Sequence, residues 1–178
     1  ERIAGWVFDQ KGELRLATRT TEKGDTEILR VDPDGFKVVY TCGVFESAGP
    51  VRFHKDGRRV YLETNKGERD LAQLVLFDPA TGKEELVETD PLKRVDFGNA
   101  AFSEVTDDLQ YVTYEDDQER IYFKDKALEA DFHRVQKALG GLLLAQEVLG
   151  HGGVQHLSRR AEFIPDVVHL ASQEVEEG

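Results

Sequence analysis

Residues 53–63 read FHKDGRRVYLE, and residues 74–82 read LVLFDPATG. In the first stretch, a turn signal at Asp56-Gly57 precedes a segment that alternates polar and apolar residues, which is typical of a half-buried strand. In the second stretch, an apolar strand signal ends at an Asp-Pro pair, where proline presets the first corner of a turn. Together they predict antiparallel strands joined by short turns.

The same signals recur along the chain. Further strand signals lie at residues 13–19 and 110–114, and the Asp-Pro pairs at positions 32 and 78 are 46 residues apart. A third copy of the order begins near Phe102 and ends near Asp125. Each unit holds roughly four short strands in consecutive order, and a unit of this kind that repeats every ~40–50 residues is typical of a β-propeller blade.

We therefore predict an all-β fold, an incomplete β-propeller of about two and a half four-stranded blades with one inserted α-helix. An antiparallel sandwich or barrel with coincidental spacing is the alternative. Because a propeller closes with roughly four to eight blades, we expect the chain to be a piece of a longer protein rather than a self-assembling unit. The expected parts are blades at about 1–47, 48–96 and 97–125, a helix at 126–139 and a non-propeller tail at 140–178.

The helix is predicted from four apolar residues, Leu128, Phe132, Val135 and Leu139, which form one stripe at helical spacing. Beyond it the composition changes. All ten lysines and fifteen of the sixteen aromatic residues lie at or before Lys137, whereas three of the five histidines lie after it. A reading-frame shift in the encoding DNA near codon 140 explains such a change, so we expect a tail that is not native to the propeller. A genuine short extension is the alternative.

Charge and hydropathy exclude several classes of function. The net charge is −12 at pH 7, and a surface of that sign repels phosphate backbones, so we predict no nucleic-acid partner. No apolar run approaches the ~18 residues that a membrane span needs, so no membrane-spanning segment is predicted.

The sequence offers few residues for chemistry, and we predict no catalytic residue, metal ligand or cofactor. Ser47 lies in FESAG, the nearest approach to the G-x-S-x-G elbow of serine hydrolases, but the first glycine is replaced and Ser47 is expected to be a loop hydroxyl. Cys42 is the single cysteine, which excludes an internal disulfide and a Cys-based zinc site. It is expected to be a buried, small apolar residue at a strand end.

Histidines and acidic residues do not form recognisable metal motifs. His151 and His156 are five residues apart, which differs from the i, i+4 spacing of two ligands on one helix face, and His169 adds no motif. Residues 115–119, EDDQE, lack the alternation and central glycine of a calcium loop and are expected to form a solvated hairpin tip. The only tryptophan, Trp6, is predicted to lie in the core of the first unit.

Four stretches resemble a known family: residues 49–61 (GPVRFHKDGRRVY), 76–87 (LFDPATGKEELV), 90–96 (DPLKRVD) and 122–126 (YFKDK). They resemble the propeller of bacterial prolyl oligopeptidase-family serine peptidases, in the subgroup of dipeptidyl and acylaminoacyl peptidases. The resemblance covers about residues 1–139. A short segment of the tail, His151-Gly152-Gly153, resembles the oxyanion loop of esterases and peptidases, but no nucleophile follows it, so we interpret the match as chance.

The resemblance implies an N-terminal propeller that filters peptide substrates for a C-terminal α/β-hydrolase domain, in a soluble protein of the bacterial cytoplasm or periplasm. We expect that catalytic domain to be absent from this chain, which alone should be inactive, and no substrate-binding residue is assigned. Open blade edges predict self-association. The alternative function is a non-catalytic TolB/WD40-like binding propeller that acts through protein contacts.

Overall fold

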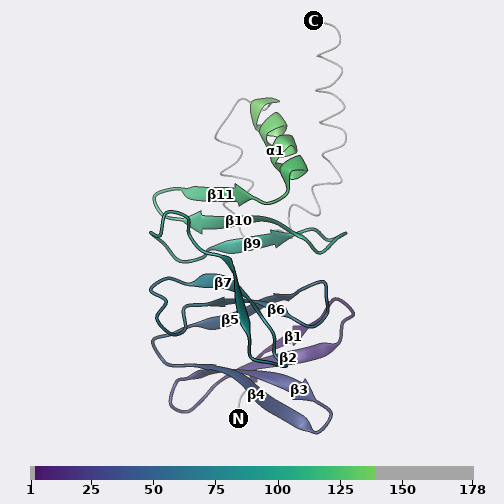
Figure 1. The fold of residues 1–178 in the computed structure, drawn as a ribbon, viewed down its shortest axis with the longest axis vertical. Coiled ribbons are helices and arrows are strands. Elements are labelled where there is room, and N and C mark those ends of the chain that lie inside the picture. The colour runs from purple at the N-terminus through teal and green to yellow at the C-terminus, as the bar shows by residue number, and fades with distance from the viewer. Residues whose placement is uncertain (1–2, 139–178) are drawn as a thin grey trace, which may run out of the picture. The chain divides into compact units, whose positions relative to one another are not determined.

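The structure, a computed structural model, describes residues 3–138 and is mostly β in that range (Figure 1). Eleven strands form three antiparallel sheets, and one helix follows them. Sheet 1 contains β1 (Ile3–Phe8), β2 (Leu14–Thr20), β3 (Thr26–Asp32) and β4 (Gly35–Cys42); sheet 2 contains β5 (Ala48–Phe53), β6 (Val60–Thr64), β7 (Gln73–Phe77) and β8 (Glu84–Glu88); sheet 3 contains β9 (Asn99–Phe102), β10 (Leu109–Glu115) and β11 (Glu119–Phe123). The all-β prediction is therefore confirmed.

Within each sheet the strands are hydrogen-bonded in chain order, so that every connection is a hairpin. Two positions show how the predicted turns work. Gly57 precedes β6 with φ 65°, and Gly82 precedes β8 with φ 73°, a left-handed conformation that favours glycine. The carboxylate of Asp56 accepts the Arg58 and Arg59 N–H groups at 2.9 and 3.0 Å. The strand-turn-strand signal in residues 53–63 thus describes the β5–β6 hairpin.

Sheet 1 packs on sheet 2 through one cluster of buried side chains. Tyr40 and Phe77 meet edge to face with ring centroids 5.2 Å apart. The Tyr40 hydroxyl lies 3.0 Å from the Thr64 hydroxyl, so that its polar end is satisfied within the cluster. The buried members are Leu16, Ile28, Tyr40 and Cys42 from sheet 1, with Phe53, Val60, Leu62, Val75 and Phe77 from sheet 2 or its ends.

The opposite face of sheet 2 packs on sheet 3 through a second cluster. Tyr61 and Phe102 lie with ring centroids 4.8 Å apart, and Phe97 meets Tyr114 edge to face at 6.1 Å. The buried members are Tyr61, Leu74, Leu76, Phe97, Ala100, Phe102, Val112 and Tyr114. Neighbouring residues of β6 and β7 therefore alternate between the two clusters, which buries sheet 2 on both faces.

The outer face of sheet 1 corrects one prediction. Trp6 was expected in the core, yet its side chain is 50% exposed, because Val7 and not Trp6 packs against the sheet 1–sheet 2 cluster. The Trp6 ring approaches that of Phe36 with centroids 6.1 Å apart, although β1 and β4 are the two edge strands of the sheet. The rings therefore reach across the middle strands, where Ala17 and Leu29 are buried.

The chain divides into two compact units, one up to Tyr122 and one from Phe123. The described part of the second unit contains the helix α1 (Lys126–Ala138). The carboxylate of Asp125 accepts the N–H groups of Ala127 at 2.9 Å and Leu128 at 3.2 Å, which caps the helix. The Phe123 ring lies 5.2 Å from that of Phe132, a member of the predicted apolar stripe.

Several predictions lie outside the described residues. They are the end of the apolar stripe at Leu139, the tail at 140–178 with its His-Gly-Gly segment, and the three tail histidines.

Candidate functional site

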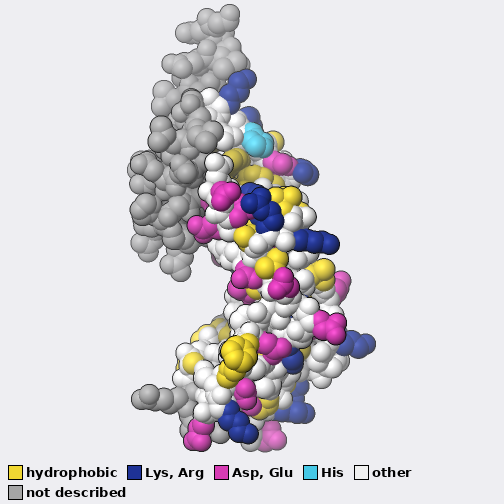
Figure 2. Space-filling model, turned by 90° about the vertical axis from the view of Figure 1, so that its left-hand side faces the viewer, with side chains coloured by type: hydrophobic (Ala, Val, Ile, Leu, Met, Phe, Trp, Pro, Cys, Tyr) yellow, Lys and Arg dark blue, Asp and Glu magenta, His cyan; other side chains and the backbone are white. Residues whose placement is uncertain are grey.

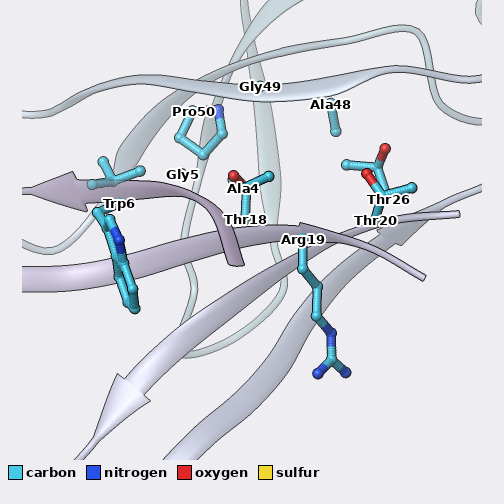
Figure 3. Close-up of a pocket in the computed structure, with 11 residues that line it drawn as sticks. Ala4, Gly5, Trp6, Thr18, Arg19, Thr20, Thr26, Ala48, Gly49 and Pro50 are labelled. Carbon is cyan, nitrogen blue, oxygen red and sulfur yellow. The ribbon is translucent and has the colours of Figure 1, made fainter. Parts of the chain in front are cut away.

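A cavity with a volume of about 360 Å³ lies between sheet 1 and sheet 2 and is lined by residues of β1, β2, β3 and β5 (Figure 3). One wall carries the side chains of Thr18, Thr20 and Thr26, which point toward Ala48 and Pro50 on the other wall. A threonine hydroxyl both donates and accepts hydrogen bonds, so this wall offers polar groups without charge.

Two further side chains that border the cavity point away from it in Figure 3: Trp6 and Arg19. The Arg19 guanidinium is bound to Glu27, with Nε 2.6 Å from Oε2. Gly5 keeps the wall open, because a β-carbon at this position would come within 2.8 Å of the Thr18 hydroxyl oxygen. The cavity is therefore an uncharged slot with hydroxyl groups on one side and small apolar groups on the other.

The cavity is lined on one side by the edge strand of sheet 2. Among the described strands, β5 pairs with β6 only. At its end, the side-chain amide of Gln10, from the β1–β2 turn, donates to the carbonyl of Phe53. Arg15 adds a bond from its guanidinium to the Gly57 carbonyl at 3.2 Å. These contacts hold the two sheets together at the opposite end of β5 from the cavity.

A buried ion pair lies elsewhere, in the connection between β8 and β9. The Asp90 side chain is fully buried and accepts hydrogen bonds from Arg120 at 2.7 and 3.1 Å. It also accepts the N–H groups of Leu92, Arg94 and Val95. The Arg120 bonds, and then those backbone groups, hold the pKa of the Asp90 carboxyl well below its usual range against the opposing effect of burial.

This pair has a structural role. All donors around Asp90 come from its own loop or from β11, and its side chain has no exposed surface that a ligand could reach. Arg120 also contacts the Tyr122 hydroxyl at 3.0 Å. A buried carboxylate with every lone pair occupied fixes the path of a loop rather than performing acid–base chemistry.

Among the described residues, those singled out in the sequence do not converge on a catalytic arrangement. Ser47 lies in the loop between β4 and β5, as predicted, and its hydroxyl is 3.3 Å from the Asn65 side-chain oxygen. Cys42 ends β4 and is 1% exposed, which confirms the prediction of a buried residue, and burial raises the pKa of its thiol. A raised thiol pKa keeps sulfur protonated and unreactive.

The acidic stretch 115–119 forms the β10–β11 hairpin, as predicted, but its tip is only partly solvated. The Asp116 carboxylate lies 3.1 Å from Arg120 and 3.6 Å from Arg94, and its side chain is 14% exposed. In residues 3–138, no group of three or more His, Cys, Asp and Glu side chains is arranged to hold a metal ion.

Charged side chains are mixed over the described surface. Figure 2 shows acidic and basic groups interspersed on the face in view, without a broad basic patch. Arg52 binds Asp107 and lies over the Phe102 ring at 5.5 Å, and Lys55 binds Asp108 at 2.5 Å. These pairs join sheet 2 to the β9–β10 loop.

Reasoning from the sequence missed the cavity and the Asp90–Arg120 pair. The cavity joins residues from β1, β2, β3 and β5, and no local pattern reports which strand edges lie side by side. Asp90 and Arg120 are 30 residues apart. The proline that follows Asp90 indicates a turn but does not indicate a buried ion pair.

No helix in the described part of the chain combines the length and the apolar character needed to cross a membrane. The chain matches no protein-family model, no curated protein and no solved structure with which it was compared.

Proposed function

We propose that this chain is part of a β-propeller that belongs to a serine peptidase of the prolyl oligopeptidase family. In this proposal, the propeller controls which peptides reach a catalytic α/β-hydrolase domain that lies outside the 178 residues. The nucleophile, its base and the oxyanion hole belong to that domain.

The observation that carries the proposal is that sheets 1 and 2 repeat the same strand pairing as well as the same sequence signals. Ala17 pairs with Leu29 across β2 and β3, and Leu62 pairs with Val75 across β6 and β7. Leu29 and Val75 are 46 residues apart, which is also the distance between the two Asp-Pro turns, and Ala17 and Leu62 are 45 residues apart. A four-stranded sheet that repeats at nearly constant spacing is the building unit of a propeller.

The direction of packing supports the same proposal. Leu62 and Val75 point from sheet 2 toward sheet 1. The equivalent residues of sheet 1, Ala17 and Leu29, point away from sheet 2, because their neighbours Leu16 and Ile28 form the shared cluster. The outer face of sheet 1 is therefore equivalent to the face of sheet 2 that packs on sheet 1. In the proposed propeller, a preceding blade would cover the outer face of sheet 1.

The family assignment rests on the resemblance of residues 49–61 and 76–87, which form the β5–β6 and β7–β8 hairpins with their turns. A non-catalytic TolB/WD40-like propeller is the second candidate, and the uncharged cavity beside β5 favours it as a binding surface within the chain itself.

The DNA that flanks and encodes residues 120–178 tests the proposal when all three forward frames are translated. We expect another frame to continue with aromatic strands and Asp-Gly turns and to reach a G-x-S-x-G elbow, followed by Asp and then His. Flanking DNA with no such elbow in any frame would contradict the peptidase assignment and favour the binding propeller.

Pure protein provides a second test. We expect no turnover of aminoacyl or peptidyl fluorogenic amides, because the described residues contain no Ser–His pair within hydrogen-bonding distance. Turnover that a serine-directed inhibitor abolishes would overturn this expectation.

A further inference from the structure

We propose that the cavity between β1 and β5 binds an extended peptide, which adds to the open edge of β5 and places one short, uncharged polar side chain between the sheets. The inference rests on the proposed function for its class of ligand, because a domain that selects peptides needs a surface that contacts them. In this mode of recognition, main-chain hydrogen bonds provide affinity and a side-chain pocket provides specificity.

The backbone of β5 has groups directed toward such a peptide. The Ser47 carbonyl accepts the Asn65 N–H at 3.3 Å, so the backbone groups of Ser47 point toward β6. Because successive residues of a strand direct their backbone groups to opposite sides, those of Ala48 and Pro50 point away from β6. Both residues line the cavity. They offer an N–H and a carbonyl at Ala48 and a carbonyl at Pro50.

The same edge already accepts an amide donor at its other end. The His54 N–H donates to the Arg59 carbonyl at 2.8 Å, which directs the backbone of Phe53 away from β6. The side-chain amide of Gln10 donates to this outward Phe53 carbonyl. Gln10 therefore occupies the position that a peptide N–H takes in strand addition, and it leaves the segment at Ala48–Pro50 for the ligand.

The cavity determines which side chain fits. Its volume of about 360 Å³ lies in the range of roughly 300–1,000 Å³ that is typical of ligand pockets. The hydroxyls of Thr18, Thr20 and Thr26 line one wall, and Arg19, the nearby cation, points away and binds Glu27. A charged side chain would therefore be desolvated without a counter-charge, whereas a serine, threonine or asparagine side chain exchanges hydrogen bonds with the hydroxyls.

The test uses the full chain and a blocked pentapeptide with threonine at its centre and alanine at the other positions. Backbone amide chemical shifts of the ¹⁵N-labelled protein are followed during titration. We expect shifts concentrated at residues 4–7 and at Ala48 and Gly49. A matched peptide that is N-methylated at its central amides should bind at least about tenfold more weakly, because it lacks main-chain donors. A peptide with valine at the centre should bind about fivefold more weakly.

Protein variants separate the edge from the cavity. Ala48→Pro removes an outward N–H without removing a bond to β6, and we expect at least about tenfold weaker binding. Thr18→Val removes one hydroxyl from the cavity and should weaken binding about fivefold. Thr41→Val is the matched control, an exposed threonine on β4 outside the cavity, and should leave binding unchanged. If Ala48→Pro does not fold, the N-methylated peptide tests the same bonds.

The inference is wrong if millimolar peptide leaves residues 4–7, 48 and 49 unshifted, or if the N-methylated peptide binds as well as its parent. Shifts at residues 48 and 49 that depend on protein concentration without peptide would also overturn it, because a second copy would then occupy the edge. Failure of peptide binding while the flanking DNA encodes a hydrolase elbow would remove this inference and leave the proposed function intact.

Discussion

Sheet 1 and sheet 2 share strand order and turn chemistry, yet they bury their faces differently. Sheet 2 packs on sheet 1 through one face and on sheet 3 through the other. Sheet 1 packs on sheet 2 through one face and has its other face covered in part by Trp6 and Phe36. The same local sequence pattern therefore produces a sheet with two neighbours and a sheet with one.

This difference in the number of buried faces shows where the stability of stacked, repeated sheets comes from. Each repeat gains most of its buried apolar surface from its neighbours rather than from within itself. Trp6 and Phe36 remain 50% and 53% exposed, so the outer face of sheet 1 is only partly removed from water. We expect substitutions in sheet 2 to cost more stability than comparable ones on this outer face.

The largest effect is expected for Phe77→Ala, which removes a 1% exposed ring from the cluster between sheets 1 and 2. The loss should be about 3–5 kcal/mol of unfolding free energy, from lost transfer free energy and the cavity left behind. Phe36→Ala is the matched control in sheet 1 and should cost less than about 1 kcal/mol. Urea denaturation followed by circular dichroism measures both. Equal losses would mean that the two faces are equally buried.

A second, smaller effect is expected where sheet 2 connects to sheet 3. Asp90→Asn keeps the shape of the side chain but leaves Asp116 as the remaining counter-charge of Arg120. We expect a loss of about 2–3 kcal/mol at pH 7. Asp117→Asn is the control, because the Asp117 side chain is 95% exposed and lies 3.8 Å from Arg94. A loss as small as that of the control would show that the Asp90 pair does not hold this connection.

The same carboxyl group predicts a pH dependence. The pKa of Asp90 is lowered in the folded state, chiefly by its hydrogen bond with Arg120. Its contribution is therefore fully present above the unfolded-state pKa of about 3.9 and is lost as the pH falls toward the folded value. The unfolding free energies of the wild type and Asp90→Asn should converge as the pH is lowered from 5 toward 2. A constant difference over that range would contradict the assignment.

On the outer face of sheet 1, Trp6→Ala should cost about 1–2 kcal/mol, because a half-buried indole is removed and Ala17 and Leu29 lose their cover. Phe45→Ala, at a 96% exposed side chain, is the control and should change stability little. Circular dichroism is the suitable probe, because Trp6 is the only tryptophan. An unchanged free energy of unfolding would mean that the contacts of the Trp6 indole with the outer face of sheet 1 do not contribute to stability.

Local patterns predicted several strands and turns of both sheets. The alternation at residues 13–19 and 59–63 corresponds to β2 and β6, and the Asp56-Gly57 signal to the turn before β6. Such features can be predicted locally, because the two-residue period of a strand and the positive φ of a turn depend on only a few neighbouring residues. The burial of Cys42 followed from its apolar neighbours in the same way.

The same patterns did not predict which side chains of a strand face the core. Alternation places Trp6 and Phe8 on one side of β1 and Val7 on the other, but all three are apolar, so the pattern leaves the core side open. The structure puts Val7 inside. The cavity was missed for a related reason, because it depends on β5 lying beside β1, a contact between separate sheets.

The smallest effect is expected at a carboxyl group inside the stack of sheets 2 and 3. Glu63 pairs with Leu74 across β6 and β7, so it lies on the face of sheet 2 that packs on sheet 3. Burial, and then the charge of Asp96, raise the pKa of the Glu63 carboxyl. Charged Glu63 therefore opposes folding at neutral pH, in contrast to Asp90.

Glu63→Gln should accordingly stabilise the protein at pH 7, by less than about 1 kcal/mol because Glu63 is only partly buried. The gain should disappear as the pH falls below the folded-state pKa, where the wild-type carboxyl is itself protonated. Glu85→Gln, at a 73% exposed side chain 3.4 Å from Arg59, is the control and should show no such gain. A destabilised Glu63→Gln at pH 7 would mean that a partner stabilises the charged carboxylate on the face of sheet 2 that packs on sheet 3.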